Sequence, residues 1–228
     1  MLRLITDFDG PIMDVSERYY RVYQYCLQQS KTEEQPVKQL AKAEFWQLKR
    51  SRVPERQIGM LSGLNEAQAK NFSRLRRNTV HSLPYLKYDC LIPDAIATLE
   101  RIQGLGFDLT VMTMRKETEL KMAFDRYNLG HFFPTDRRYC LPNDYIKTID
   151  TEDKPKLMAR AIDELPSAAD VWMVGDTEAD IIAAKTHNIK AIGVLSGIRD
   201  RKRLAIHQPD AIVNNLGEAV DAIVASLN

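Results

Sequence analysis

The chain has 228 residues, of which 44% are hydrophobic and 28% are charged, as is typical of a globular protein. Its 32 basic and 31 acidic side chains leave a formal net charge of +1, which gives no electrostatic basis for binding nucleic acid or an anionic membrane. Three widely spaced cysteines, Cys26, Cys90 and Cys140, argue against a disulfide framework or a zinc site and indicate a reducing compartment. No apolar run approaches the ~18 residues of a membrane span, and Asp7 interrupts any signal-peptide core, so we expect a cytoplasmic chain.

The opening apolar run, Leu2–Thr6, predicts a buried strand that ends at Asp7-Phe8-Asp9-Gly10. In open α/β sheets, ligands bind at the carboxyl ends of the strands. Two carboxylates aimed at one point repel each other unless a cation or a proton joins them. Asp7 and Asp9 therefore predict a metal ion, a shared proton or both, although an acidic turn explains the pair about equally well when it is taken alone.

Residues 15–86 have helical periodicity and no convincing strand pattern. Pro36 interrupts this pattern, whereas Asn65 and Glu66 suit the start of a helix. Helices are expected from Ser16 to Leu27, over Val37–Lys49, in a short segment after Pro54 and over Asn65–Leu83. The segment predicts a small helical bundle.

From residue 87 onward, strand and helix patterns alternate. Strands are predicted at Phe107–Met112, Arg138–Leu141, Val171–Val174, Ala191–Leu195 and Ala211–Val213. Helices are predicted at Pro93–Gln103, Glu117–Tyr127, Pro155–Leu165, Ala179–Thr186, Arg199–Ile206 and from Leu216 onward. This alternation predicts an α/β fold with a doubly wound, Rossmann-like and mostly parallel sheet. We expect a core domain of residues 1–14 and 87–228, with residues 15–86 as an inserted helical domain.

Two polar residues stand near predicted element ends. Thr113 follows a strand, where its hydroxyl and the amides of the next helical turn suit a phosphate oxygen. Lys154 precedes the helix predicted from Pro155, and a cation at a helix start opposes the helix dipole, which suggests a partner anion. Taken singly, a capping threonine and a surface lysine are the simpler interpretations.

The strongest segment is Gly175-Asp176-x-x-x-Asp180, which follows the strand Val171–Val174. Gly175 permits a tight turn that aims Asp176 over the sheet edge, and Asp180 lies one helical turn further along the same face. With Asp7, these carboxylates supply the hard oxygen ligands that magnesium prefers. Helix capping alone could explain either carboxylate, but less easily both.

Taken in order, these segments resemble the haloacid dehalogenase superfamily of phosphohydrolases, and the resemblance covers nearly the whole chain. Residues 15–86 are similar to the helical, C1-type cap of that family, and Ala191–Gly197 is similar to its phosphoglycolate-phosphatase-like branch. The matching motifs are Asp7-x-Asp9-Gly10 with Asp14 following, Thr113, Lys154 and Gly175-Asp176-x-x-x-Asp180.

One position departs from the family pattern. Pro11 follows Gly10, where these proteins usually carry Thr. Proline removes a backbone donor and fixes φ, so we expect a stiffer flap. Because neither carboxylate is displaced, the chemistry should survive.

The resemblance implies a magnesium-dependent phosphatase that acts on a small phosphorylated metabolite through an aspartyl-phosphate. Asp7 is the implied nucleophile. Asp9 is the implied acid for the leaving group and then the base for water, while Lys154 pairs with Asp7 and a phosphoryl oxygen. The implied metal site comprises Asp7, Asp9 through its backbone carbonyl, Asp176 and, through water or a neighbour, Asp180.

The remaining expected contacts concern the substrate. An acidic two- or three-carbon phosphate, phosphoglycolate foremost, is the leading substrate class. A substrate carboxylate or second phosphate could bind arginines of a basic run at a connection between helices, although a solvated loop explains that run more simply. The predicted phosphate-binding and substrate-binding residues are Phe8, Gly10, Thr113, Met114, Arg115, Lys49, Arg50 and Arg52.

Other functions remain open at this point. A sugar phosphomutase of the same superfamily would use the same core residues but would have to protect its intermediate from water. A phospho-acceptor signalling module also combines carboxylates, Thr and Lys, yet it is much shorter and lacks the helical block. Dehalogenase chemistry is disfavoured because it needs neither a magnesium site nor an acid at Asp9. The sequence leaves open whether the protein is a monomer or a homodimer.

Overall fold

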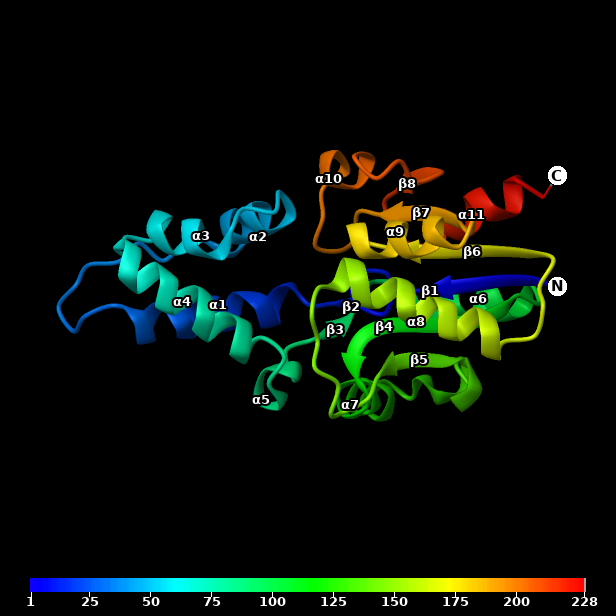
Figure 1. Cartoon of the computed structure of the whole chain (residues 1–228), viewed down its shortest axis with the longest axis horizontal. Helices are drawn as coiled ribbons and strands as arrows, with labels where there is room; N and C mark the ends of the chain where they lie inside the picture. Colours follow the sequence, from blue (N-terminus) through cyan, green and yellow to red (C-terminus); the bar gives the residue numbers. More distant parts are fainter. Residues whose placement is uncertain (228) are drawn as a thin grey trace. The chain divides into compact units, whose positions relative to one another are not determined.

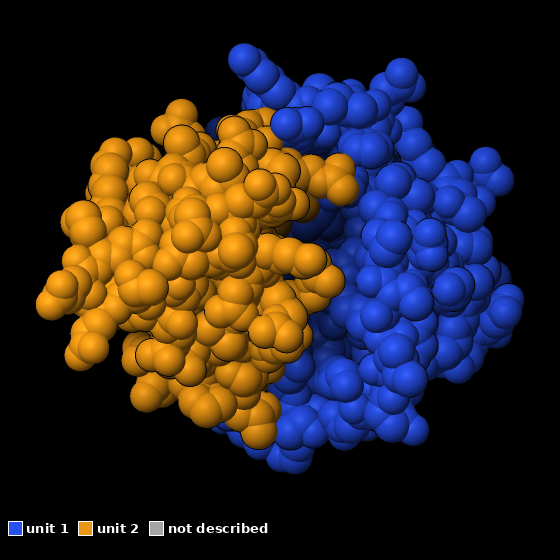
Figure 2. All heavy atoms as spheres, turned by 60° about the vertical axis from the view of Figure 1, so that its left-hand side comes forward, with its two compact units in different colours: residues 1–14, 91–197, 201–228 blue, residues 15–90, 198–200 orange. Residues whose placement is uncertain are grey.

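The computed structural model describes residues 1–227, and these residues form two compact units. An α/β unit contains residues 1–14, 91–197 and those from 201 onward, and a helical unit contains residues 15–90 and 198–200. Figure 2 colours the α/β unit blue and the helical unit orange. The helical unit thus extends four residues past our expected boundary at residue 86 and includes a short segment from the second half of the chain.

The α/β unit is built on a six-stranded sheet in the order β5-β4-β1-β6-β7-β8. All neighbouring strands in it are parallel, so the predicted doubly wound sheet is confirmed. The strands are β1 (Leu2–Thr6), β4 (Asp108–Lys116), β5 (Arg138–Leu141), β6 (Asp170–Gly175), β7 (Lys190–Val194) and β8 (Ala211–Val213). Two short strands, β2 (Met13–Asp14) and β3 (Cys90–Leu91), form a second sheet.

Helices cover the parallel sheet. Helices α8 and α9 pack together, as do α6 and α11, and the first pair lies in front of the sheet in Figure 1. The helices of this unit are α6 (Ala95–Gly104), α7 (Glu117–Tyr127), α8 (Asp150–Glu164), α9 (Glu178–Thr186), α10 (Arg201–Ala205) and α11 (Leu216–Ala225). Two 3₁₀ turns, Leu129–His131 and Thr135–Arg137, precede β5.

Strand parity explains how one face of this sheet is built. Ile5 and Met173 are register partners on β1 and β6, so their side chains point to the same face. Both belong to a buried apolar cluster with Met158 of α8 and Ile181 of α9. The face of β1 that carries Ile5 is therefore the face that α8 and α9 cover.

The helical unit contains α1 (Ser16–Ser30), α2 (Lys42–Arg50), α3 (Glu55–Leu61), α4 (Glu66–Thr79) and α5 (Leu83–Leu86). Its core is aromatic: the Tyr23 and Phe45 rings stack at 4.7 Å, and Phe72 meets Tyr23 edge-on at 6.1 Å. At the start of α4, Asn65 and Gln68 form a capping box with both hydrogen bonds at 2.9 Å. Among residues 1–227, no helix is both long and apolar enough to cross a membrane.

Two predicted helix starts are wrong. Helix α2 begins at Lys42 rather than Val37, because the backbone of Leu40 is held by α1: its amide donates to the Tyr23 hydroxyl (2.9 Å) and its carbonyl accepts from Tyr20 (3.0 Å). Helix α8 begins at Asp150, five residues before Pro155. Acidic residues in its first turn favour this earlier start.

The end of β4 also differs from the prediction. The strand continues to Lys116 instead of ending at Met112, and its register with β5 shifts between these two residues. Met112 pairs with Tyr139 and Lys116 pairs with Leu141. Over this segment β4 therefore uses more residues than β5 does. A bulge of this kind redirects side chains locally, and Thr113 lies within it.

Candidate active site

The site forms where the strand order reverses, at the carboxyl ends of β4, β1 and β6. The Asp7 amide donates to the Val174 carbonyl at 2.8 Å, so the backbone of β1 stays paired with β6 for one residue beyond the strand. Asp7 therefore keeps the parity of Ile5 and faces α8. Asp176 follows β6 directly.

Asp7 and Lys154 form a buried ion pair in which Lys154 Nζ lies 2.8 Å from Asp7 Oδ2. Only 1% of the Lys154 side chain and 10% of the Asp7 side chain are exposed. The amide of Phe8 donates to Asp7 Oδ1 at 2.7 Å. Burial raises the pKa of Asp7, Lys154 lowers it, and the nearby Asp180 and Asp176 carboxylates raise it further, so this pKa lies well above its usual value. Both carboxylate oxygens of Asp7 thus have defined partners.

Lys154 also binds Asp180, so a single amine bridges two carboxylates. Burial lowers the pKa of Lys154, but Asp180 and Asp7 raise it by more, which keeps the amine charged. Lys154 lies inside α8 rather than at a helix start, so our reason for expecting an anion beside it was wrong. The other oxygen of Asp180 accepts from the amide (2.9 Å) and the hydroxyl (2.7 Å) of Thr177.

Asp176 lies against two glycines. A Cβ atom on Gly10 or on Gly197 would collide with the Asp176 side chain, and Gly10 also needs its left-handed φ of +93°. The Ser196 hydroxyl donates to the Gly10 carbonyl at 2.8 Å, which joins the two glycine segments around this carboxylate. Neither Ser196 nor Gly197 was among the predicted site residues, although both lie in the segment that resembles the phosphoglycolate-phosphatase branch.

The three carboxylates fit a divalent cation. Oxygens of Asp7, Asp176 and Asp180 lie within 4.8 Å of one another, and all three residues are buried. Lys154 offsets one negative charge, so the cluster favours an additional cation. Because Lys154 and Thr177 already bind Asp180, Asp7 and Asp176 are better suited as direct ligands.

The neighbouring group consists of Asp9, Arg115 and Thr113. Arg115 binds Asp9 Oδ1 through Nε (2.8 Å) and Nη2 (2.6 Å). Thr113 Oγ1 accepts a hydrogen bond from the Arg115 amide at 3.2 Å, so the hydroxyl proton of Thr113 can be donated elsewhere. The structure thus brings Asp9, Thr113 and Arg115 to the same sheet edge as Asp7.

The other predicted substrate-binding residues have contacts of their own. Met114 packs against the apolar cluster of the sheet. Lys49, Arg50 and Arg52 belong to the helical unit. There Lys49 is paired with Glu55, the Arg50 side chain binds the Arg199 carbonyl at 3.3 Å, and Arg52 has a left-handed φ of 59°.

The chain is similar in sequence to known hydrolases and phosphatases. The family model described as HAD-hydrolase-like matches residues 153–219, which include Lys154, Asp176 and Asp180. A phosphoglycolate phosphatase from Vibrio cholerae is 26% identical over 166 residues, covering 70% of this chain and 67% of the relative. Pyrophosphatase PpaX from Bacillus velezensis is 24% identical over 161 residues, covering 69% of this chain and 70% of the relative.

The chain therefore spans about two thirds of the length of these curated relatives. A solved structure, a haloacid dehalogenase-like family hydrolase from Streptococcus pneumoniae, aligns over 97% of both chains with a TM-score of 0.67 and 17% identity. That likeness supports the fold, and the family model covers the segment that carries three of the clustered side chains. By its sequence matches, the chain resembles the haloacid dehalogenase-like hydrolases and the phosphoglycolate phosphatases.

Proposed function

We propose that this hydrolase is a magnesium-dependent phosphatase that cleaves small phosphomonoesters through an aspartyl-phosphate on Asp7. The observation that carries the proposal is the convergence of Asp7, Lys154 and Asp176 at the point where the strand order reverses. A buried nucleophile beside a cation and further carboxylates suits transfer of a phosphoryl group, which demands mainly positioning and neutralisation of charge.

In the first step, an oxygen of Asp7 forms a bond to phosphorus, and the bond between phosphorus and the leaving oxygen breaks. Asp9 gives its proton to the leaving oxygen. In the second step, Asp9 takes a proton from water as the water oxygen attacks phosphorus, so that Asp7 is regenerated and inorganic phosphate leaves. The hydrogen bond from the Phe8 amide and the ion pair with Lys154 orient the Asp7 carboxylate for the attack.

Two further side chains are suited to bind the phosphoryl oxygens. Lys154 is a fixed, charged donor, and the hydroxyl of Thr113 has a proton to donate because its oxygen accepts from the Arg115 amide. Asp7 and Asp176 would hold magnesium, with the Asp9 carbonyl as a further ligand and Asp180 as an indirect one. When bound, magnesium supplies charge neutralisation as a Lewis acid.

We infer that the substrate is a small acidic phosphate ester in the cytoplasm, with phosphoglycolate as the leading member of this class. The named activity of the Vibrio cholerae relative supports this choice. The three cysteines are free thiols, which is consistent with a reducing compartment. The name of the Bacillus velezensis relative makes pyrophosphate a necessary competitor in any substrate test.

The test is release of inorganic phosphate from p-nitrophenyl phosphate and from a panel that contains phosphoglycolate, glycerol phosphate and pyrophosphate. We expect magnesium-dependent release that EDTA abolishes, with the highest kcat/KM for a small acidic ester. Absence of release from every compound in the presence of magnesium would contradict the phosphatase assignment. A preference for pyrophosphate would be consistent with the proposed phosphoryl transfer but would contradict the assignment of small acidic phosphate esters as substrates.

A further inference from the structure

Arg115 is a buried arginine whose side chain is committed to Asp9. Its Nε and Nη2 atoms lie 2.8 and 2.6 Å from the same oxygen, Asp9 Oδ1. The guanidinium also lies over the Phe8 ring, 5.1 Å from its centroid. Only 2% of the Arg115 side chain is exposed, compared with 23% for Asp9. A fixed cation thus holds a carboxylate that is itself partly open to solvent.

Arg115 lies within the bulge in β4. Because the register shift lies between Met112 and Lys116, the alternation of side chains along the strand is interrupted here. The Arg115 amide donates to Thr113 Oγ1 at 3.2 Å, so the same local geometry positions both residues. Spacing in the sequence suggested a phosphate contact for Arg115 and gave no indication of its pairing with Asp9.

Orientation of Asp9 matters because proton transfer requires close approach to the leaving oxygen. Charge-assisted hydrogen bonds are short and strong, and the guanidinium is held in turn by the Phe8 ring. We infer that Arg115 is a positioning residue that orients Asp9 for proton transfer and thereby allows the enzyme to cleave alkyl phosphates, whose alkoxide leaving groups require a proton. The inference rests on the proposed function, in which Asp9 exchanges that proton.

Variants of Arg115 test this with two classes of ester. p-Nitrophenyl phosphate has a leaving group that needs little protonation, whereas glycerol phosphate releases an alkoxide. The two esters share the later step in which Asp9 activates water, so the comparison uses kcat/KM, which reports formation of the aspartyl-phosphate alone. For Arg115→Met we expect kcat/KM on glycerol phosphate to fall by about 10²-fold and kcat/KM on p-nitrophenyl phosphate by less than about 10-fold. We expect Arg115→Lys to restore part of the loss on glycerol phosphate.

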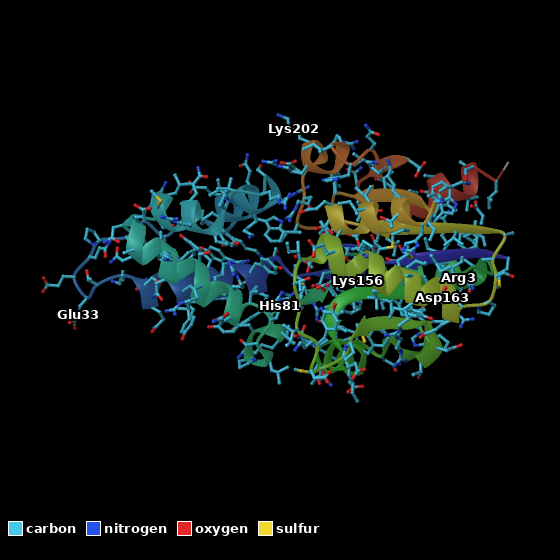
Figure 3. All side chains as sticks on the ribbon, in the orientation of Figure 1. Arg3, Glu33, His81, Lys156, Asp163 and Lys202 are labelled. Atoms are coloured by element: carbon cyan, nitrogen blue, oxygen red, sulfur yellow. The ribbon has the colours of Figure 1, made fainter. Side chains whose placement is uncertain are left out.

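The chain offers a matched control at the other end of β1. Arg3 binds one oxygen of Asp108 through Nε (2.7 Å) and Nη2 (2.6 Å), with side-chain exposures of 5% and 8%. Figure 3 labels Arg3 near the start of β1. Arg3→Met removes a similar ion pair without touching Asp9, so we expect reduced thermal stability and an unchanged ratio of the two activities.

Three outcomes decide the inference. Equal losses of kcat/KM on both esters for Arg115→Met would overturn it and favour direct phosphate binding by Arg115. If Arg115→Met does not fold, Arg115→Gln and Arg115→Lys are measured in its place, and an unchanged ratio in both overturns the inference. Wild-type protein that hydrolyses neither ester would instead contradict the proposed function.

Discussion

The two units of the molecule bury charge in opposite ways. In the α/β unit, the carboxylates of Asp7, Asp176 and Asp180 share one buried amine, that of Lys154. This cluster therefore carries more negative than positive charge. Burying unbalanced charge is costly unless a partner joins it, and the oxygen atoms of this cluster are suited to an added metal cation.

In the helical unit, a buried cluster carries more positive than negative charge, and its cations surround an aromatic ring. The cations of Arg18, Lys49 and Arg76 lie 5.4, 5.8 and 4.8 Å from the centroid of the Tyr19 ring. Carboxylates neutralise part of this charge: Arg76 lies 2.8 Å from Glu55, and Arg18 pairs with another acidic residue of the same unit. Cation–π contacts stabilise such clusters without an added ligand. The comparison teaches that the negative cluster has the oxygen atoms and the excess charge that suit an added cation, whereas the positive cluster is offset by carboxylates and an aromatic ring of its own unit.

The largest expected effect comes from replacing the nucleophile. Asp7→Asn removes the attacking carboxylate, so we expect phosphatase activity to fall by more than about 10³-fold. The fold should persist, because the buried Lys154 retains its ion pair with Asp180. Phosphate release and circular dichroism measure the two quantities. Activity near the wild-type level in a folded Asp7→Asn protein would contradict the assignment of the nucleophile.

Magnesium should stabilise the protein through its acidic cluster. At 100 times its dissociation constant, a ligand specific to the native state adds about 2.7 kcal/mol to the free energy of unfolding, which is about 5 °C or more in Tm for a chain of this size. We expect Asp176→Asn to abolish this shift. Glu55→Gln, which alters the cluster of the helical unit, should keep it. A magnesium shift that survives Asp176→Asn would place the ion elsewhere.

The glycine beside Asp176 provides a finer test. In Gly197→Ala the added Cβ collides with the Asp176 side chain, so we expect at least about a 10-fold loss of activity and a smaller stabilisation by magnesium. Gly104→Ala is the matched control, because a Cβ there meets no atom within 4 Å. It lies in the last turn of α6 and should leave activity unchanged. Equal activity in the two variants would show that Gly197 does not shape the site.

The sequence contains the strand-end carboxylates of this site but not the way in which they are held. Asp176 and Asp180 were recognisable because a buried strand ending in Gly-Asp, followed by a helix, fixes both on one side by spacing alone. The pairing of Lys154 with Asp180 was not recognisable, because it depends on the packing of α8 against α9. The pairing of Arg115 with Asp9 joins residues of two different strand ends, β4 and β1, and spacing along one segment does not report it.

Lys49 illustrates the same limit in the helical unit. Its basic neighbours suggested either a solvated loop or contact with a substrate anion. In the structure, only 12% of its side chain is exposed, and the amine is paired with Glu55. Burial of this kind arises when α2, α3 and α4 assemble, and composition along a single segment does not determine it.

The pH dependence of folding should reveal the cost of burying Lys49. Burial and the nearby Arg76 lower the pKa of Lys49 from 10.5 to about 8, despite the opposing effect of Glu55. Between these two pH values the unfolded chain holds the proton more tightly, so this residue makes the folded state more stable as the pH rises. Below pH 8 both states are protonated and the full cost remains. Lys49→Met removes that cost, so the variant should be more stable than wild type at pH 7, by on the order of 1–3 kcal/mol.

The advantage of Lys49→Met should shrink between pH 8 and pH 10, and urea unfolding of both proteins at pH 7 and pH 10 measures it. Lys38→Met is the control, because Lys38 forms an exposed ion pair with Glu44 and should show no such trend. A constant difference between wild type and Lys49→Met at the two pH values would mean that the amine is not buried as a charge. The positive cluster of the helical unit would then resemble an ordinary solvated surface, and its contrast with the acidic cluster of the α/β unit would disappear.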